Sequence, residues 1–283
     1  MSLRAATAVE PAGEGAWRGE VLPGCDIAGN ANGGYLLAIA ARAAAEATGR
    51  PDPVSVTAHY LAPAQPGPVT IETRVLKEGR RFATASATLS SEERPLVSVL
   101  GSFGDLQPGS GTERIESGPP DLPPPEDCVP VEPADGGALI DRGSSQGESI
   151  NVPSIFPPPF VGQIELRLHP DHVGFGGLPG MPRVSGWFRL RDGEPIDTLA
   201  LLVAVDAFPP TIFFANPPVA WVPTLELTTH VRSRPEPGWL RCAFTTRFIT
   251  GGFLEEDGEV WDSTGRLVAQ SRQLALLPRQ EEA

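Results

Sequence analysis

A carboxylate at the end of an apolar helix is the side chain of this sequence best suited to acid–base chemistry. Asp206 follows the unbroken apolar run 199–205, and Pro209 and Pro210 prevent the helix from continuing. Burial at such a place disfavours the charged form of a carboxylate, which raises its pKa and makes it a better base. The alternative is an ordinary surface aspartate at a helix end.

The turn Asn32-Gly33-Gly34 is a second candidate, because it immediately precedes an Ala-rich helix expected at about 35–48. Backbone N–H groups in the first turn of a helix lack intrahelical partners and carry the positive end of the helix dipole. They suit a thioester carbonyl or another oxygen that becomes negative during a reaction. Glycines there are equally explained by tight helix–sheet packing, and both explanations can hold together.

Lys77, Arg80 and Arg81 form the most concentrated basic patch, at an expected hairpin turn. Their charges could receive the phosphates of a ligand. A turn of this kind is more often simply solvated, so that alternative stays open. The net charge of −13 argues against a general surface for nucleic acid or anionic membranes, since both need clustered Lys and Arg.

Two sets of elements must position these residues. In the first set, the helix at 35–48 is apolar nearly all round, which is typical of a helix enclosed by other structure. Alternating apolar residues then predict four strands, at 54–61, 69–77, 82–89 and 95–103. Short turns join these strands, so neighbouring strands must be antiparallel.

The second set has the same order. A strand is expected at 183–189, a helix at 197–207 with Asp197 as its N-cap, and four strands at 224–231, 239–248, 255–262 and 265–277. Between the sets, 104–135 is rich in Pro, Gly, Ser and acidic residues, which predicts an extended linker. One clear strand, 161–168, lies in the poorly patterned stretch that follows.

The two sets form an internal repeat. Identical residues recur 171 positions apart without a gap, as His59 does at His230 and Phe82 at Phe253. A duplicated unit, each copy a helix followed by an antiparallel meander, predicts two sheets that each curl around one helix. Polar residues present in only one copy are then candidates for chemistry.

The composition limits the other possibilities. The 283 residues contain three widely spaced cysteines, Cys25, Cys128 and Cys242, which indicate neither a disulfide framework nor a zinc site. No signal peptide is visible at the N-terminus, and no apolar stretch approaches the ~20 residues that cross a bilayer. We therefore expect a cytoplasmic protein without a membrane segment.

Small motifs of the first set resemble TesB-type acyl-CoA thioesterases. They are the runs 32–35 (Asn-Gly-Gly-Tyr), 57–61 (Thr-Ala-His-Tyr-Leu) and 79–85 (Gly-Arg-Arg-Phe-Ala-Thr-Ala), and the likeness extends over about 20–105 and 184–278. The resemblance implies an α+β double-hotdog fold, in which two helix-in-curled-sheet units are fused in one chain. We expect the first unit at 1–105, a Pro/Gly-rich linker at 106–160 and the second unit at 161–283.

The resemblance also implies a catalytic trio of Asp206, Thr224 and Gln273. In this family an aspartate ends the second helix, a threonine opens the next strand, and a glutamine lies on the last strand. Gln270 is the alternative to Gln273; the two face opposite sides of a regular strand, so only one of them can point inward. The prolines after Asp206 depart from the family pattern and leave the direction of its carboxylate open.

The function implied is hydrolysis of a fatty or related acyl-CoA by water activated at the trio. Coenzyme A would be part of the substrate, with its phosphates on Lys77, Arg80 and Arg81. We expect no cofactor, metal or nucleic acid, and we leave further homo-oligomeric assembly open. A binder that does not turn over thioesters is an alternative. A hotdog hydratase or dehydratase is disfavoured, since Asp26 is followed five residues later by Ala31 and not by a histidine.

Overall fold

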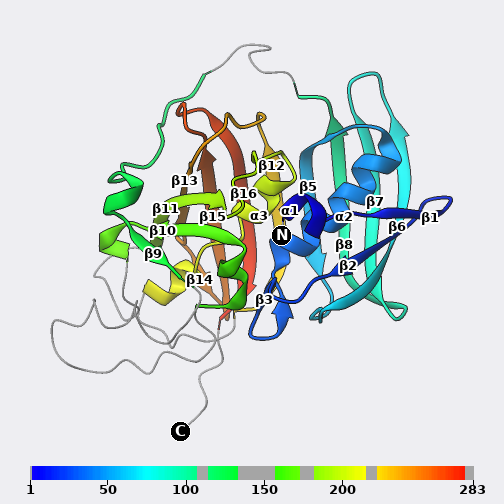
Figure 1. The fold of residues 1–283 in the computed structure, drawn as a ribbon, viewed down its shortest axis with the longest axis horizontal. Coiled ribbons are helices and arrows are strands. Elements are labelled where there is room, and N and C mark those ends of the chain that lie inside the picture. Colours follow the sequence, from blue (N-terminus) through cyan, green and yellow to red (C-terminus); the bar gives the residue numbers. More distant parts are fainter. Residues whose placement is uncertain (1, 107–113, 133–156, 173–181, 215–221, 278–283) are drawn as a thin grey trace, which may run out of the picture.

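A computed structural model describes residues 2–106, 114–132, 157–172, 182–214 and 222–277. It contains two units that stand side by side, each with an antiparallel sheet that curls around a helix (Figure 1). The sheets pair edge to edge through β5 (Asp52–Tyr60) and β12 (Thr224–Val231), which join them into one 14-stranded sheet. This is the double-hotdog arrangement that the sequence predicts.

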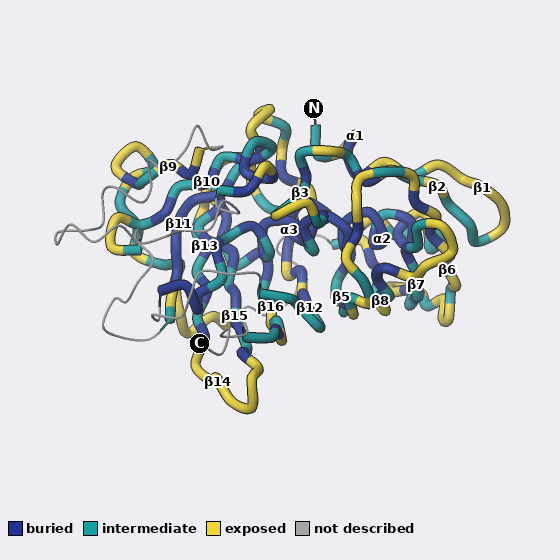
Figure 2. The backbone as a smooth tube through the Cα atoms, turned by 90° about the horizontal axis from the view of Figure 1, so that it is seen from below, coloured by how far each residue is buried: buried dark blue, intermediate teal, exposed yellow. Residues whose placement is uncertain are grey.

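The helix of the first unit is α2 (Gly33–Thr48). Asn32 caps its N-terminus by accepting a hydrogen bond from the N–H of Tyr35, and Gly49 ends it in the left-handed conformation. Most of its residues are buried, so the helix is enclosed as its uniformly apolar sequence predicts (Figure 2). Three strands cover it: β6 (Gly67–Glu78), β7 (Ala83–Ser91) and β8 (Arg94–Gly104).

The N-terminal segment adds elements that the sequence pattern does not reveal. They are α1 (Leu3–Ala6), β1 (Glu10–Gly13), β2 (Ala16–Val21), β3 (Asp26–Ile27) and β4 (Asn30–Ala31). The buried Tyr35 hydroxyl donates to the carbonyl of Ala6 at 2.8 Å, which ties this segment to α2. The strands escape prediction because β2 is short and only its last residue is fully buried.

The second unit has a much shorter helix, α3 (Ala200–Ala204), than the 197–207 predicted. The N-cap residue is Leu199 and not Asp197 as predicted, although the Asp197 carboxylate accepts from the N–H of Ala200 at 2.8 Å. The helix ends early because its last turn tightens, with the N–H of Asp206 bonded to the carbonyl of Val203, before the two prolines. Its sheet contains β10 (Ile164–Leu168), β11 (Arg183–Leu190), β13 (Leu240–Thr245), β14 (Ile249–Thr250), β15 (Phe253–Trp261) and β16 (Leu267–Leu276).

The stretch expected as a linker also contributes to the second sheet. Strand β9 (Val129–Val131) pairs with β10, and Cys128 and Val131 are buried. Short 3-10 helices complete the described chain: η1 (Pro125–Asp127), η2 (Pro159–Gly162), η3 (Pro170–His172) and η4 (Thr211–Phe214). None of the helices in these ranges is long and apolar enough to span a membrane.

Candidate active site

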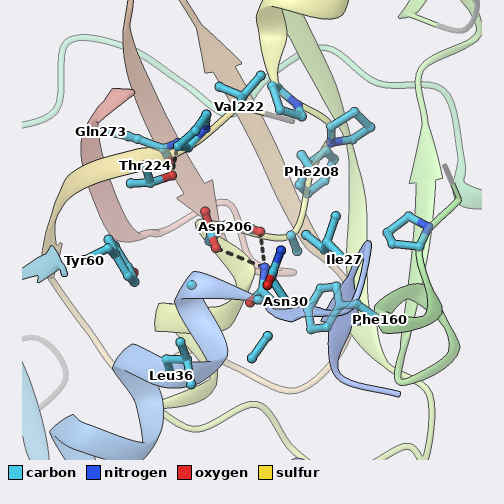
Figure 3. Close-up of a pocket in the computed structure, with 18 of the residues that line it drawn as sticks. Ile27, Asn30, Leu36, Tyr60, Phe160, Asp206, Phe208, Val222, Thr224 and Gln273 are labelled. Atoms are coloured by element: carbon cyan, nitrogen blue, oxygen red, sulfur yellow. Dashed lines mark hydrogen bonds between the residues drawn. The ribbon is translucent and has the colours of Figure 1, made fainter. Parts of the chain in front are cut away.

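A cavity of about 280 Å³ lies at the N-terminus of α2, between the two units (Figure 3). Most of its wall is apolar, with Phe160, Phe208 and Phe213 among the larger side chains. Its polar groups include those of Asp206, Thr224, Gln273, Asn32 and Glu256. Residues that are far apart in sequence therefore share one partly enclosed space, which is the usual setting of a small-molecule site.

The carboxylate of Asp206 is held by the first turn of the other unit's helix. Its Oδ2 accepts from the backbone N–H of Gly34 at 2.7 Å and from the side-chain amide of Asn32 at 3.0 Å. Burial raises the pKa of Asp206 to about 6, although these hydrogen bonds act in the opposite direction. The group is therefore a base tuned close to neutral pH, with a fixed orientation despite the prolines that follow it.

Thr224 and Gln273 reach the same cavity from neighbouring strands. The Gln273 side-chain nitrogen donates to the Thr224 hydroxyl oxygen at 2.8 Å. A bulge between Thr224 and Glu226 shifts the register of β12 against β16, and places Thr224 opposite the buried Ala275. Without this extra residue the threonine would face the other side of the sheet.

Gln270 does not line the cavity. It lies three residues from Gln273 on the same regular part of β16, so its side chain leaves the opposite face of the sheet. The geometry therefore favours Gln273 over Gln270 as the amide of the site.

The N–H groups at the start of α2 have a different role from the one expected. Of the predicted oxyanion donors Asn32, Gly33 and Gly34, the first and the last are already directed at Asp206 in this structure. They position and partly compensate a half-buried carboxylate, where the sequence had suggested a free oxyanion hole.

The alternative explanation for the glycines, close packing, also holds. A Cβ on Gly34 would stand 2.5 Å from the carbonyl oxygen of Leu202, and one on Gly33 would meet the Tyr60 ring at 3.0 Å. Both positions therefore leave little room for any side chain.

Tyr60 forms a part of the wall that the sequence analysis did not single out. Its hydroxyl is buried without a hydrogen-bond partner, close to Gly33. Burial raises its pKa well above the usual range, and the nearby charge of Asp206 adds to the effect, so the phenol is neutral. The strand pattern carries no signal for this, because Tyr60 is the last residue of β5 and aromatic residues are common in strands.

Two family models match this chain. One, the acyl-CoA thioesterase N-terminal domain, covers residues 23–104, and the other, the acyl-CoA thioesterase C-terminal domain, covers residues 125–277. The chain belongs to the acyl-CoA thioesterase family. Its resemblance to TesB-type proteins is thereby confirmed.

Similar proteins agree with this thioesterase family. A crystal structure from Thermobifida fusca, provisionally named a thioesterase II, is 32% identical with a TM-score of 0.81, over 98% of this chain and 97% of that one. An uncharacterized protein of Mycobacterium tuberculosis is 31% identical over 93% of this chain and 91% of its own length. Acyl-CoA thioesterase II TesB2 from Mycobacterium marinum, 19% identical with a TM-score of 0.71 over 99% of each chain, supports the fold alone.

The predicted phosphate site does not adjoin the cavity of this thioesterase-family chain. Lys77, Arg80 and Arg81 are exposed at the β6–β7 turn, and Arg50 donates to the carbonyl of Arg80 at 3.1 Å. Arg50 follows the C-terminal end of α2, whereas the cavity lies at the N-terminal end. A helix of 16 residues is about 24 Å long. Lys77, Arg80 and Arg81 therefore lie at the opposite end of α2 from the cavity, and their role in binding phosphates stays a prediction.

Glu256 is a functional candidate that the sequence analysis missed. It lies on β15 directly opposite Gln273 in the register, is only 9% exposed, and lines the cavity. The signal was available, since Leu254, Glu256 and Gly258 alternate as inward positions while Glu255 and Asp257 alternate outward. It went unused because a run of three acidic residues suggests a solvated strand.

The two helices differ at the position of the catalytic candidate. Asn32 and Asp197 each accept a hydrogen bond from the N–H three residues further on, so the two positions can be compared. Asp206 lies nine residues after Asp197, and the residue nine after Asn32 is Ala41, a buried alanine. The first unit thus has a methyl group where the second has a carboxylate.

The strands differ in the same way. At the offset of 171 residues, the position of Thr224 is taken in the first unit by Pro53, and that of Gln273 by Ser102. The described part of the chain therefore supplies the trio once. In the same part, no group of three His, Cys, Asp or Glu side chains could hold a metal ion.

Proposed function

We propose that this chain hydrolyses acyl-CoA thioesters, with Asp206 as the base and Thr224 and Gln273 as the groups that hold the attacking water. The observation that carries the proposal is a carboxylate with a raised pKa in an apolar cavity beside a hydroxyl and an amide. The family membership supports the reaction class. The proposal includes a fatty or related acyl group as the part of the substrate that is released as the acid, and a location in the cytoplasm.

The polar atoms match the hydrogen-bonding capacity of one water molecule. Because the Gln273 nitrogen donates to the Thr224 oxygen, the threonine's own proton can be donated to a water. That water would give one proton to Asp206 and the other to the carbonyl oxygen of Gln273. A lone pair then remains for attack on the thioester carbonyl carbon.

The reaction follows from this arrangement. As the water oxygen bonds to the carbonyl carbon, Asp206 takes its proton and the carbonyl oxygen becomes negative. Collapse of the tetrahedral intermediate breaks the carbon–sulfur bond, and the proton on Asp206 passes to the leaving thiolate. The products are the free acid and coenzyme A, and Asp206 is again ionised.

Thiol release from a panel of acyl-CoAs, short to long and branched to aromatic, tests the proposal. We expect turnover of some members by the wild type and at least a 100-fold lower kcat in Asp206→Asn, which keeps the size of the side chain. The same variant should still bind the substrate, as measured by calorimetry. Undiminished hydrolysis by Asp206→Asn would falsify the assignment, and saturable binding without turnover by the wild type would favour a non-catalytic binder.

A further inference from the structure

Glu256 is a buried acid that the proposed hydrolysis does not use. It lies across one strand interval from Gln273, and directly opposed Cβ atoms in a sheet are about 4.5–5.5 Å apart. The remaining strands of the second unit, and not the first unit, continue beyond it. Glu256 is therefore placed next to the group that holds the water, on the side of the cavity that leads into the second unit.

The carboxyl group has acceptor capacity to spare. Its Oε2 accepts the backbone N–H of Thr211 at 2.8 Å, at the start of η4. A carboxylate offers about four lone-pair positions, of which the N–H of Thr211 occupies one, while the Thr211 hydroxyl is bonded to that of Thr246 at 2.6 Å. Burial raises the pKa of Glu256 to about 7, with a smaller contribution from the charge of Asp206. Near neutral pH the group can thus both donate and accept.

Burial of an acid is costly unless its oxygens are hydrogen-bonded, and the N–H of Thr211 satisfies only part of this capacity. Other side chains that line the cavity, such as Phe213 and Leu166, are apolar and would suit a plain hydrocarbon chain without an acid among them. A tie to Thr211 does not require a carboxylate, because a neutral amide would accept the same N–H. The geometry calls for a polar group on the part of the substrate that enters the second unit.

We propose that Glu256 binds a hydroxyl group on the acyl part of the substrate, so that the preferred substrates are hydroxyacyl thioesters. This inference rests on the proposed thioesterase function. A hydroxyl can donate to the ionised acid and accept from the protonated one, and its desolvation costs far less than that of an ammonium group. Since Glu256 is close to Gln273, we expect the hydroxyl on a carbon near the thioester carbonyl.

Matched pairs of thioesters test the assignment. Each pair has one chain length, with and without a hydroxyl on the second, third or fourth carbon, and kcat/KM is measured for both members. We expect the wild type to prefer one hydroxylated member by at least about tenfold, the effect of one hydrogen bond to a charged partner. Equal rates, or a preference for every plain chain, would overturn the proposal without any variant.

Variants then separate recognition from support of the fold. Glu256→Leu should lower the hydroxyl preference by about 10- to 100-fold, and Glu256→Gln should restore part of it because an amide can still hydrogen-bond a hydroxyl. Glu259→Gln is the matched control on the outward side of β15, and should leave the preference unchanged. If Glu256→Leu lowers the rates of both members equally, the residue acts only on structure and the proposal fails.

The outcome is distinguishable from failure of the hydrolase proposal. If the wild type releases no thiol from any member, hydrolysis is refuted. The same pairs are then compared as non-hydrolysable thioether analogues by calorimetry. Tighter binding of the hydroxylated analogue, lost in Glu256→Leu, would still support the role of Glu256, and equal affinities would overturn it.

Discussion

The side-chain amide of Asn32 donates to both the backbone carbonyl and the carboxylate of Asp206, at 2.9 and 3.0 Å. The two residues are 174 positions apart and belong to different units. The same asparagine caps α2 through its other amide atom. One residue of the first unit therefore connects the start of its own helix to the proposed base of the second.

Replacement of Asn32 by serine separates these two roles. Serine is also a good N-cap, so the cap is kept, and the free energy of unfolding should fall by about 1–3 kcal/mol through the hydrogen bonds lost to Asp206. The amide donor to Asp206 is lost, and we expect kcat to fall by about tenfold or more because the base is less well oriented. Thermal unfolding and thiol release measure the two effects. If Asn32→Ala loses activity and Asn32→Ser keeps it, only the cap matters and the hydrogen bond to Asp206 does not.

The raised pKa of Asp206 predicts the pH dependence of the reaction. The base must be ionised, so kcat/KM should rise with pH through about 6 and level off above it. A profile that is flat from pH 5 to 8 for a well-cleaved substrate would contradict this role. Product release must be shown not to limit the rate, which single-turnover measurements establish.

The same pKa shift predicts that the free energy of unfolding falls as pH rises, whereas the activity increases. Because the pKa of Asp206 is higher in the folded chain than its ordinary value of 3.8, the folded state binds more protons between about pH 4 and 6. Ionised Asp206 therefore lowers stability above pH 6, and this cost disappears below pH 4. Asp206→Asn should be more stable than the wild type by about 1–3 kcal/mol at pH 7.5, and by much less at pH 4. Denaturant unfolding at both pH values checks the difference.

The contact of the two helices predicts that Gly34 tolerates no side chain. A Cβ there would lie 2.5 Å from the carbonyl oxygen of Leu202 and 2.8 Å from the Cβ of Asp206. Gly34→Ala should cost about 1–3 kcal/mol or more of unfolding free energy and should also displace the base. Gly118→Ala is a suitable control, because nothing lies within 4 Å of its added Cβ. A stable and active Gly34→Ala would contradict the packing described here.

The position of the basic turn predicts that its charges do not bind coenzyme A in this cavity. Alanine at Lys77, Arg80 and Arg81 together should change KM for an acyl-CoA by less than about twofold at moderate ionic strength. A KM that rises tenfold, with an unchanged kcat, would show that this turn does bind the phosphates of coenzyme A. In that case the bound ligand would have to extend to the other end of α2, or come from a second copy of the chain.

The sequence alone was sufficient for the main strands, for α2 and for the repeat. Period-two alternation and short turns predict the main strands, and the Ala-rich run predicts α2, because these signals arise from neighbouring residues. Alternation also shows that Gln273 and Gln270 face opposite sides of the strand, but only the structure places Gln273 at the cavity. The early end of α3 was harder to foresee, since its residues 199–205 are apolar throughout and only the prolines beyond them limit the helix.

Only the tertiary structure decided which polar groups meet. Thr224 faces the cavity because a bulge shifts β12, and Asn32 and Gly34 serve Asp206 because the two helices touch end to end. Burial of Glu256 and the isolation of the Tyr60 hydroxyl depend likewise on contacts between distant segments. The physical reason is common to all of these. Local patterns determine which way a chain turns and which face is apolar, whereas hydrogen-bond partners and desolvation depend on everything that packs around a group.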